Sequence, residues 1–266
     1  MPLDDTQLDR YRQEGYLVVD SLFAPAEIEV LLAAFARDAR VEGPQRILEE
    51  DGTGVRAVYA SHLRQPEFAD LVRSPRVLGV ARQLLDDELY LYQLKINAKP
   101  ALGGERWAWH QDFPAWRIMD DLPAPRLVNV AVFLDDVTEF NGPVVYVPGS
   151  HQAGTLADTR RGPARSAQHL DPDDIALRPD QLAGLMGRHG MVSPKGPAGT
   201  VVFFSPQIVH GSAQNMSPHA RRLLILTFNE VTNQPRHRGA PRAEYLVGRD
   251  TTPLVVAGGT LTGAAR

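Results

Sequence analysis

The chain has 266 residues, no cysteine, a formal net charge of −4 and a sequence pI of about 6.1. Its length suits one large domain, expected over residues 1–266, and its 43% hydrophobic and 23% charged content is ordinary for a globular protein. The composition excludes disulfides and thiolate metal sites and gives no indication of a nucleic-acid partner.

No apolar stretch is long enough to span a bilayer, so no membrane partner is expected. The first residues lack both the basic start and the apolar run of a secretory signal. We therefore expect a cytoplasmic location.

The first 88 residues or so are expected to be mainly helical and to pack on a β core. Apolar residues at helical spacing, such as Leu31, Leu32 and Phe35, indicate core-facing stripes. Helices are expected over residues 4–13, from Pro25 onward, over Pro66–Val72 and over 77–85. A strand is expected over Tyr16–Val19, and a hairpin within 47–59 that uses Val55–Tyr59 as one strand.

From Leu89 onward, short runs rich in aliphatic and aromatic residues predict strands. These runs cover residues 89–96, 128–134, 144–147, 200–204 and 223–228. Many short strands late in the chain favour a mainly β fold with flanking helices, built on a barrel or jelly roll. The polar insertion at 155–193 is long for a loop and is interpreted as a possible lid, with a short helix near 179–186.

Two motifs, about a hundred residues apart, carry the chemistry. His110 and Asp112 end the run Trp-Ala-Trp-His-Gln-Asp, and His210 lies in Val-His-Gly-Ser. Alternate side chains of a strand share a face, so we expect His110 and Asp112 to lie on one extended strand and His210 to arrive from a distant one. Two imidazoles and one carboxylate are the ligand set of non-heme Fe(II) oxygenases.

Other metals fit this ligand set less well than iron does, although the sequence alone does not exclude them. Zinc more often takes a tetrahedral site of His or Cys, and calcium and magnesium favour oxygen ligands. A lone His-x-Asp triplet also occurs by chance, and Asp112 alone could be a helix cap or a turn residue. The addition of His210 and of Arg221 beyond it favours the functional interpretation.

With these residues placed, the chain resembles the phytanoyl-CoA dioxygenase family of Fe(II)- and 2-oxoglutarate-dependent oxygenases. The similarity is densest over residues 93–99, 107–116, 134–143, 147–151 and 208–229. Within the family, the stretches 209–219 and 244–253 resemble the bacterial free L-proline 4-hydroxylases most, and the ectoine hydroxylases next. The resemblance implies a double-stranded β-helix core of the cupin type, with 2-oxoglutarate and O2 as co-substrates.

The resemblance also implies roles for particular residues. His110, Asp112 and His210 would bind iron, and Arg221, eleven positions after His210, would clamp the far carboxylate of 2-oxoglutarate. Ser212, Asn97 and Gln93 would line the co-substrate side, where Gln93, Lys95 and Asn97 share one strand face. Trp116, Gln93 and Phe204 would contact the substrate, although core packing is the commoner role of an aromatic. His151 and His219 are not expected to be ligands.

One departure from the closest relatives concerns the substrate. After Trp116 they usually have an acidic-Gly-Met segment, whereas this chain reads Arg117-Ile-Met-Asp-Asp-Leu without glycine. Arg117 could hold a substrate carboxylate or could simply be exposed. Arg222, next to Arg221, is expected to face the opposite side of its strand.

The leading hypothesis is an oxygenase that hydroxylates an unactivated C–H bond of a free L-amino acid or similar small molecule, with 4-hydroxylation of L-proline as the first choice. A second hypothesis keeps the iron site but assigns a carrier-bound or natural-product intermediate as substrate. A third, from another class, is a cupin-like metal-binding protein without oxygenase activity, in which Arg221 would have no role.

Overall fold

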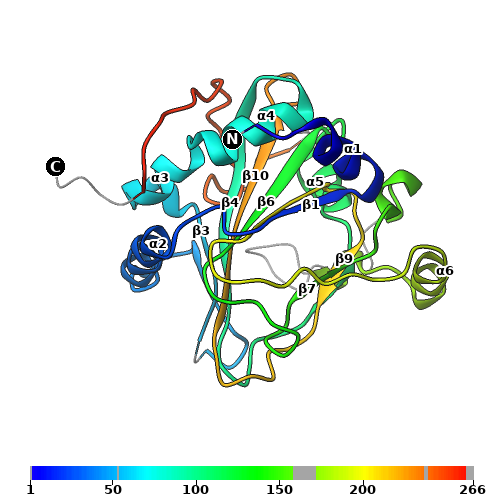
Figure 1. The fold of residues 1–266 in the computed structure, drawn as a ribbon, viewed down its shortest axis with the longest axis horizontal. Helices are drawn as coiled ribbons and strands as arrows, with labels where there is room; N and C mark the ends of the chain where they lie inside the picture. The colour runs from blue at the N-terminus through cyan, green and yellow to red at the C-terminus, as the bar shows by residue number, and fades with distance from the viewer. Residues whose placement is uncertain (1, 53, 158–171, 237–238, 262–266) are drawn as a thin grey trace.

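Two antiparallel sheets face each other in the computed structural model, which describes residues 2–52, 54–157, 172–236 and 239–261 (Figure 1). The larger sheet has the order β1 (Tyr16–Val19), β8 (Val201–Phe204), β6 (Leu127–Phe133), β10 (Arg221–Glu230), β4 (Leu89–Lys99), β3 (Val55–Tyr59) and β2 (Arg46–Leu48). The smaller sheet has the order β5 (Trp107–His110), β9 (His210–Ser212) and β7 (Val144–Tyr146).

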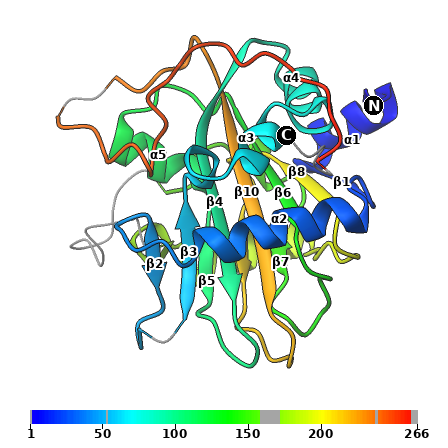
Figure 2. The same cartoon turned by 90° about the vertical axis from the view of Figure 1, so that its left-hand side faces the viewer.

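Helices cover the outer face of the larger sheet, where α2 and α3 run across β4 and β10 (Figure 2). The helices of the described residues are α1 (Asp5–Glu14), α2 (Pro25–Asp38), α3 (Pro66–Val72), α4 (Val80–Leu85), α5 (Asp112–Asp120) and α6 (Pro179–His189). Of these, α5 follows β5 directly, and α6 lies beside the smaller sheet, where Leu185 packs with Val147 and Val209. Single turns form at Ser61–Leu63, Pro75–Gly79, Ser150–Ala153 and Pro172–Ile175. None of the helices in the described part of the chain is both long and apolar enough to cross a membrane.

The two faces of β10 show why this sequence forms two layers. Leu224 and Leu226 pack into the hydrophobic core beneath the helices. Leu223 and Ile225 point the other way and line a cavity between the sheets. This alternation confirms the predicted mainly β jelly-roll fold with flanking helices, because one face of each central strand is buried under helices and the other encloses a site.

Most predicted elements are confirmed within a few residues, and two needed correction. The helix expected over 77–85 is α4 preceded by a π-type turn at Pro75–Gly79. The expectation that His110 and Asp112 share a strand is wrong: β5 ends at His110, and α5 begins at Asp112. Gln111 between them has extended dihedral angles and serves as the N-cap, so the chain turns from strand to helix inside the motif.

The insertion at 155–193 is described only in part. Residues 158–171 of the expected lid lie outside the described residues, so the lid interpretation stays a prediction. The helix expected near 179–186 is confirmed as α6, somewhat longer than predicted. Leu177, which precedes it, donates its backbone N–H to the carbonyl of Trp109 at 2.9 Å and so ties this stretch to β5.

Glu27 joins three parts of the helical layer. Its carboxylate accepts hydrogen bonds from the backbone N–H groups of Ala24 (3.0 Å) and Leu261 (3.1 Å) and from both terminal nitrogens of Arg76 (2.8 and 2.5 Å). The hydrogen bonds from Arg76 are the main cause that lowers the pKa of Glu27 from 4.5 to about 2. The carboxylate is almost fully buried.

We expect Glu27→Gln to lower the free energy of unfolding at pH 7 by about 2–3 kcal/mol, because a buried ion pair loses one partner. A depressed pKa stabilises the fold above pH 4.5, and this contribution is lost as the pH falls toward 2. Urea unfolding of both proteins at pH 7 and near pH 3 checks this. Equal midpoints at pH 7 would contradict it.

Candidate active site

Strand register brings the two histidines together. His110 in β5 and His210 in β9 are directly opposite each other in the smaller sheet, and Tyr146 in β7 is opposite His210 on the other side. The two imidazole centroids lie 4.3 Å apart. Residues a hundred positions apart in the sequence therefore become cross-strand neighbours whose side chains are in contact.

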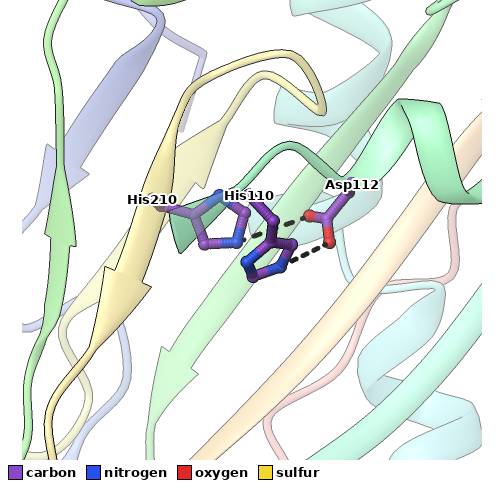
Figure 3. Close-up of side chains that lie close together, drawn as sticks. All are labelled: His110, Asp112 and His210. Atoms are coloured by element: carbon purple, nitrogen blue, oxygen red, sulfur yellow. Dashed lines mark ion pairs between the residues drawn. The ribbon is translucent and has the colours of Figure 1, made fainter. Parts of the chain in front are cut away.

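Asp112 completes the cluster from the first turn of α5 (Figure 3). Its carboxylate oxygens lie 3.6 Å from Nε2 of His110 and 3.8 Å from Nε2 of His210. Ligand atoms from the three side chains all lie within 4.8 Å of one another, and no other such group occurs among the described residues. The carboxylate and both Nε2 atoms thus converge on one point.

Backbone carbonyls orient both imidazoles. Nδ1 of His110 lies 2.6 Å from the carbonyl of Ala108, and Nδ1 of His210 lies 3.0 Å from that of Ile208. A carbonyl only accepts, so each Nδ1 carries the proton and each Nε2 presents a lone pair toward Asp112. This is the usual second-sphere arrangement of a metal-binding histidine.

The protonation states also fit a metal site. Burial lowers the pKa of His210 to about 4, and the neighbouring His110 adds to the shift. Burial alone would raise the pKa of Asp112, but the two histidines outweigh it and hold that pKa below its ordinary range. At neutral pH the cluster therefore offers a carboxylate and neutral imidazole, the forms that bind a metal ion. Two nitrogens and one oxygen fit Fe(II) in particular.

A buried amide fixes the carboxylate. Asn129 in β6 donates to Oδ2 of Asp112 at 2.8 Å, and its own Oδ1 accepts a hydrogen bond from the hydroxyl of Thr227 in β10 at 2.7 Å. Asn129 was not predicted from the sequence. In the sequence Asn129 stands out only as a polar residue in the otherwise apolar strand β6. Its role can be inferred only when β6 is known to lie beside the cluster.

We expect Asn129→Ala to weaken metal binding about 10- to 100-fold, the usual cost of losing a second-sphere partner. Thr227→Val, which removes only the group that holds Asn129, should have a smaller effect in the same direction. Titration of the apoprotein with Mn(II), followed by electron paramagnetic resonance, measures both. Unchanged affinity in folded Asn129→Ala protein would show that the amide does not position Asp112.

The cluster opens into a cavity between the two sheets. Three residues predicted for the co-substrate, Asn97, Ser212 and Arg221, line it, as do the predicted substrate contacts Trp116 and Phe204. The structure therefore brings these residues together with the histidine and aspartate cluster, and their individual roles remain proposals.

Arg221 is the most unusual of them because it is a cation with only 1% of its surface exposed. One terminal nitrogen donates to the carbonyl of Gly142 at 2.7 Å, whereas Nε has no partner among the described residues. Burial lowers its pKa to about 10. Arg222 faces the other way, as predicted, and its Nε donates to Asp135 at 2.7 Å. A buried guanidinium with a free donor is a receptor for an anion.

Lys99 and Tyr146 also border this region and were not predicted. Lys99 is buried at the end of β4, directly opposite Arg221 in the sheet, and its ammonium group donates to the carbonyl of Ala213. Burial lowers the pKa of Lys99 to about 7, with Arg221 adding to the shift. Lys99 could have been predicted from the sequence, because residues 93, 95 and 97 share one strand face and position 99 continues it. Tyr146 stacks on His210 with centroids 5.9 Å apart.

A second hollow continues from the metal cluster toward α5. Trp116 and Gln93 line it together with Tyr59, Ile175 and Arg242. The side-chain amide of Gln93 donates to the carbonyl of Leu246 at 2.7 Å, and this residue lines the second hollow but not the cavity with Arg221. Phe204 contacts His210 edge-on, with centroids 5.5 Å apart.

The residues that follow Trp116, where the sequence analysis noted a departure from related enzymes, form the second half of α5. Arg117 lies on its exposed face and lines neither hollow. Asp120, at the end of the helix, is buried and pairs with Arg242 through two hydrogen bonds of 2.8 and 2.5 Å. The hydroxyl of Tyr92 donates to the same carboxylate. Arg242, not Arg117, is therefore the arginine that lines the second hollow.

Comparison with known proteins identifies the family of the chain. The family model described as phytanoyl-CoA dioxygenase (PhyH) matches residues 11–223, a range that contains the whole cluster and Arg221. The chain belongs to the phytanoyl-CoA dioxygenase family.

Several characterised members of this family are similar over almost the whole chain. The L-proline trans-4-hydroxylase of Streptomyces griseoviridis is 40% identical over 260 residues, which covers 96% of each chain. The ectoine dioxygenase of Streptomyces anulatus is 35% identical over 263 residues, covering 95% of this chain and 88% of the relative. The crystal structure of EctD from S. alaskensis with 2-oxoglutarate and 5-hydroxyectoine has a TM-score of 0.84 at 29% identity, covering 97% of this chain and 89% of that one.

Proposed function

We propose that this dioxygenase hydroxylates free L-proline at C4, using Fe(II), 2-oxoglutarate and O2. The observation that carries the proposal is the convergence of His110, Asp112 and His210 on one cavity that also contains the buried, incompletely bonded guanidinium of Arg221. The similarity to an L-proline trans-4-hydroxylase across 96% of both chains supports proline as the substrate. The cytoplasmic location rests on the sequence expectations alone.

Different residues would bind the metal and the co-substrate. His110, Asp112 and His210 would hold the iron, and Arg221, with Ser212 and Asn97 nearby, would bind the far carboxylate of 2-oxoglutarate. Bound iron supplies oxygen activation coupled to decarboxylation of 2-oxoglutarate. The buried rings of Tyr146 and Phe204 pack against His210 and would limit the access of water to the iron site.

The substrate side is formed by the second hollow. Trp116 and Gln93 would contact the amino acid there, next to the metal cluster. Trp116 is buried and packs edge-on against Tyr92, with centroids 5.2 Å apart, so these contacts would hold its ring in place. A rigid wall decides which carbon is attacked, because a displacement of about 1 Å can cost on the order of a hundredfold in rate.

Succinate release tests the proposal. Iron-loaded protein with 2-oxoglutarate and O2 is assayed with L-proline, L-pipecolate, L-leucine and ectoine, and products are identified by mass spectrometry. Stimulation by L-proline, with a product heavier by one oxygen atom, is the expected result. Slow succinate release that no compound stimulates would redirect the search to larger or carrier-bound substrates. No succinate from protein shown to contain iron would support the cupin-like alternative, which family membership disfavours.

A further inference from the structure

Lys95 lies at the junction of the two hollows. It stands on β4 between Gln93 and Asn97, which share its face of the strand. It is half-buried and lines both the cavity that contains Arg221 and the hollow that contains Trp116. Its ammonium group lies 5.6 Å from the ring centroid of Trp107, within the range of a cation–π contact.

Two cations border the substrate hollow, and they differ in how their charge is balanced. Arg242 is neutralised by the two-fold contact with Asp120. Lys95 forms no hydrogen bond or ion pair with any residue that the structure describes. The carboxylate of Asp112 lines both hollows with Lys95, and the charge of Lys95 contributes to the lowered pKa of that carboxylate. A metal ion bound by Asp112 would take up this negative charge and leave the half-buried ammonium group to be balanced by a bound anion.

The spacing along the sheet separates this charge from the co-substrate clamp. Lys95 is opposite Ile225 on β10, whereas Arg221 is four residues further along the same strand. Four residues of a strand span roughly 13 Å, so the two cations face different parts of the cavity. The far carboxylate of 2-oxoglutarate, held at Arg221, therefore does not satisfy Lys95.

The choice of residue type is also informative. The chain has 28 lysines and arginines together, but its only lysines are Lys95, Lys99 and Lys195. Two of them stand on the inner face of β4. Lysine offers a compact charge on a flexible stem, which suits a single carboxylate beside a ring better than a planar guanidinium does.

We propose that Lys95 binds the carboxylate of the amino-acid substrate and so selects substrates that carry one. This inference rests on the proposed function and adds the group that would recognise a free amino acid. It predicts that an analogue in which the carboxylate is replaced by an uncharged amide is a poor substrate for the unaltered enzyme and that Lys95 is the cause.

The test compares L-proline with L-prolinamide in unaltered iron-loaded enzyme, Lys95→Met and Lys95→Arg, with Lys195→Met as the matched control that removes an exposed lysine. In Lys95→Met we expect the KM for L-proline to rise about tenfold or more, as for loss of a charge-assisted hydrogen bond. The preference for L-proline over L-prolinamide should fall by a similar factor, while the KM for 2-oxoglutarate stays within about twofold. Lys95→Arg should keep most of the preference, and Lys195→Met all of it.

Three outcomes would overturn the inference. An unchanged preference in Lys95→Met would show that Lys95 does not bind the substrate carboxylate. A raised KM for 2-oxoglutarate alone would assign the lysine to the co-substrate. If no free amino acid stimulates the unaltered enzyme, the proposed function itself fails and the inference with it, which is distinct from the first two results. Circular dichroism checks the fold, and Lys95→Gln, with a polar stem, replaces the methionine variant if that variant does not fold.

Discussion

Asp112→Ala is expected to abolish turnover, with a loss of roughly a thousandfold or more, because iron would lose its one carboxylate ligand and the negative charge that balances it. The same variant should no longer be stabilised by metal. For the unaltered protein, a metal ion at about 100 times its dissociation constant adds about 2.7 kcal/mol to the free energy of unfolding, or roughly 5–10 °C in Tm. Thermal unfolding with and without Mn(II), together with succinate release, measures both effects.

Asp180→Ala is the matched control for this experiment, because Asp180 is an exposed carboxylate on α6 that pairs only with Arg178 among the described residues. It should keep full turnover and the full shift in Tm. Succinate formation at the normal rate by Asp112→Ala would show that the carboxylate is not a metal ligand.

Arg221→Met is expected to raise the KM for 2-oxoglutarate on the order of a hundredfold, since truncating one partner of a buried charge pair usually costs 2–5 kcal/mol. The KM for L-proline at saturating 2-oxoglutarate should change little, because Arg221 lies away from the hollow lined by Trp116 and Gln93. Initial rates over a matrix of both concentrations separate the two constants.

Arg222→Met is the control for Arg221→Met. It is the next residue on the same strand, but it faces away from the cavity and pairs with Asp135. Its loss should affect stability and leave the KM for 2-oxoglutarate unchanged. If the two variants behave alike, the predicted division of the strand into an anion-binding face and an outer face is wrong.

Helices and strands whose apolar residues repeat at a regular spacing could be predicted from the sequence. A helix that follows a strand without a break, such as α5, could not. The stripe of Leu31 and Phe35 identified α2, and the alternation of β10 separated Arg221 from Arg222. The helix α5 was missed because Asp112 continues the pattern of β5 at a two-residue spacing. Its Pro114 lies in the first turn, where a helix tolerates proline, but reads as an interruption in the sequence.

The candidate site shows the same limit. His110, Asp112, His210 and Arg221 could be found because their residue types and spacing indicate a chemistry. Asn129 could not be found, because its hydrogen bond to Asp112 is visible only in the structure. The difference between Arg242 and Lys95 could not be predicted either, because the sequence does not show that Arg242 pairs with Asp120.

The wall of the second hollow, where we propose that the substrate binds, depends in part on residues that follow the family match. That match ends at residue 223, whereas Arg242 grips α5 and Leu246 accepts a hydrogen bond from Gln93. Gly248 also donates its N–H to the carbonyl of Tyr92 at 2.8 Å, which fixes this late segment against β4. Part of the surroundings of the second hollow is thus supplied by chain beyond the family match, whereas the proposed iron ligands and Arg221 lie within it. We expect that a substitution at Arg242 or Leu246 would alter the shape of the second hollow while leaving the proposed iron ligands in place.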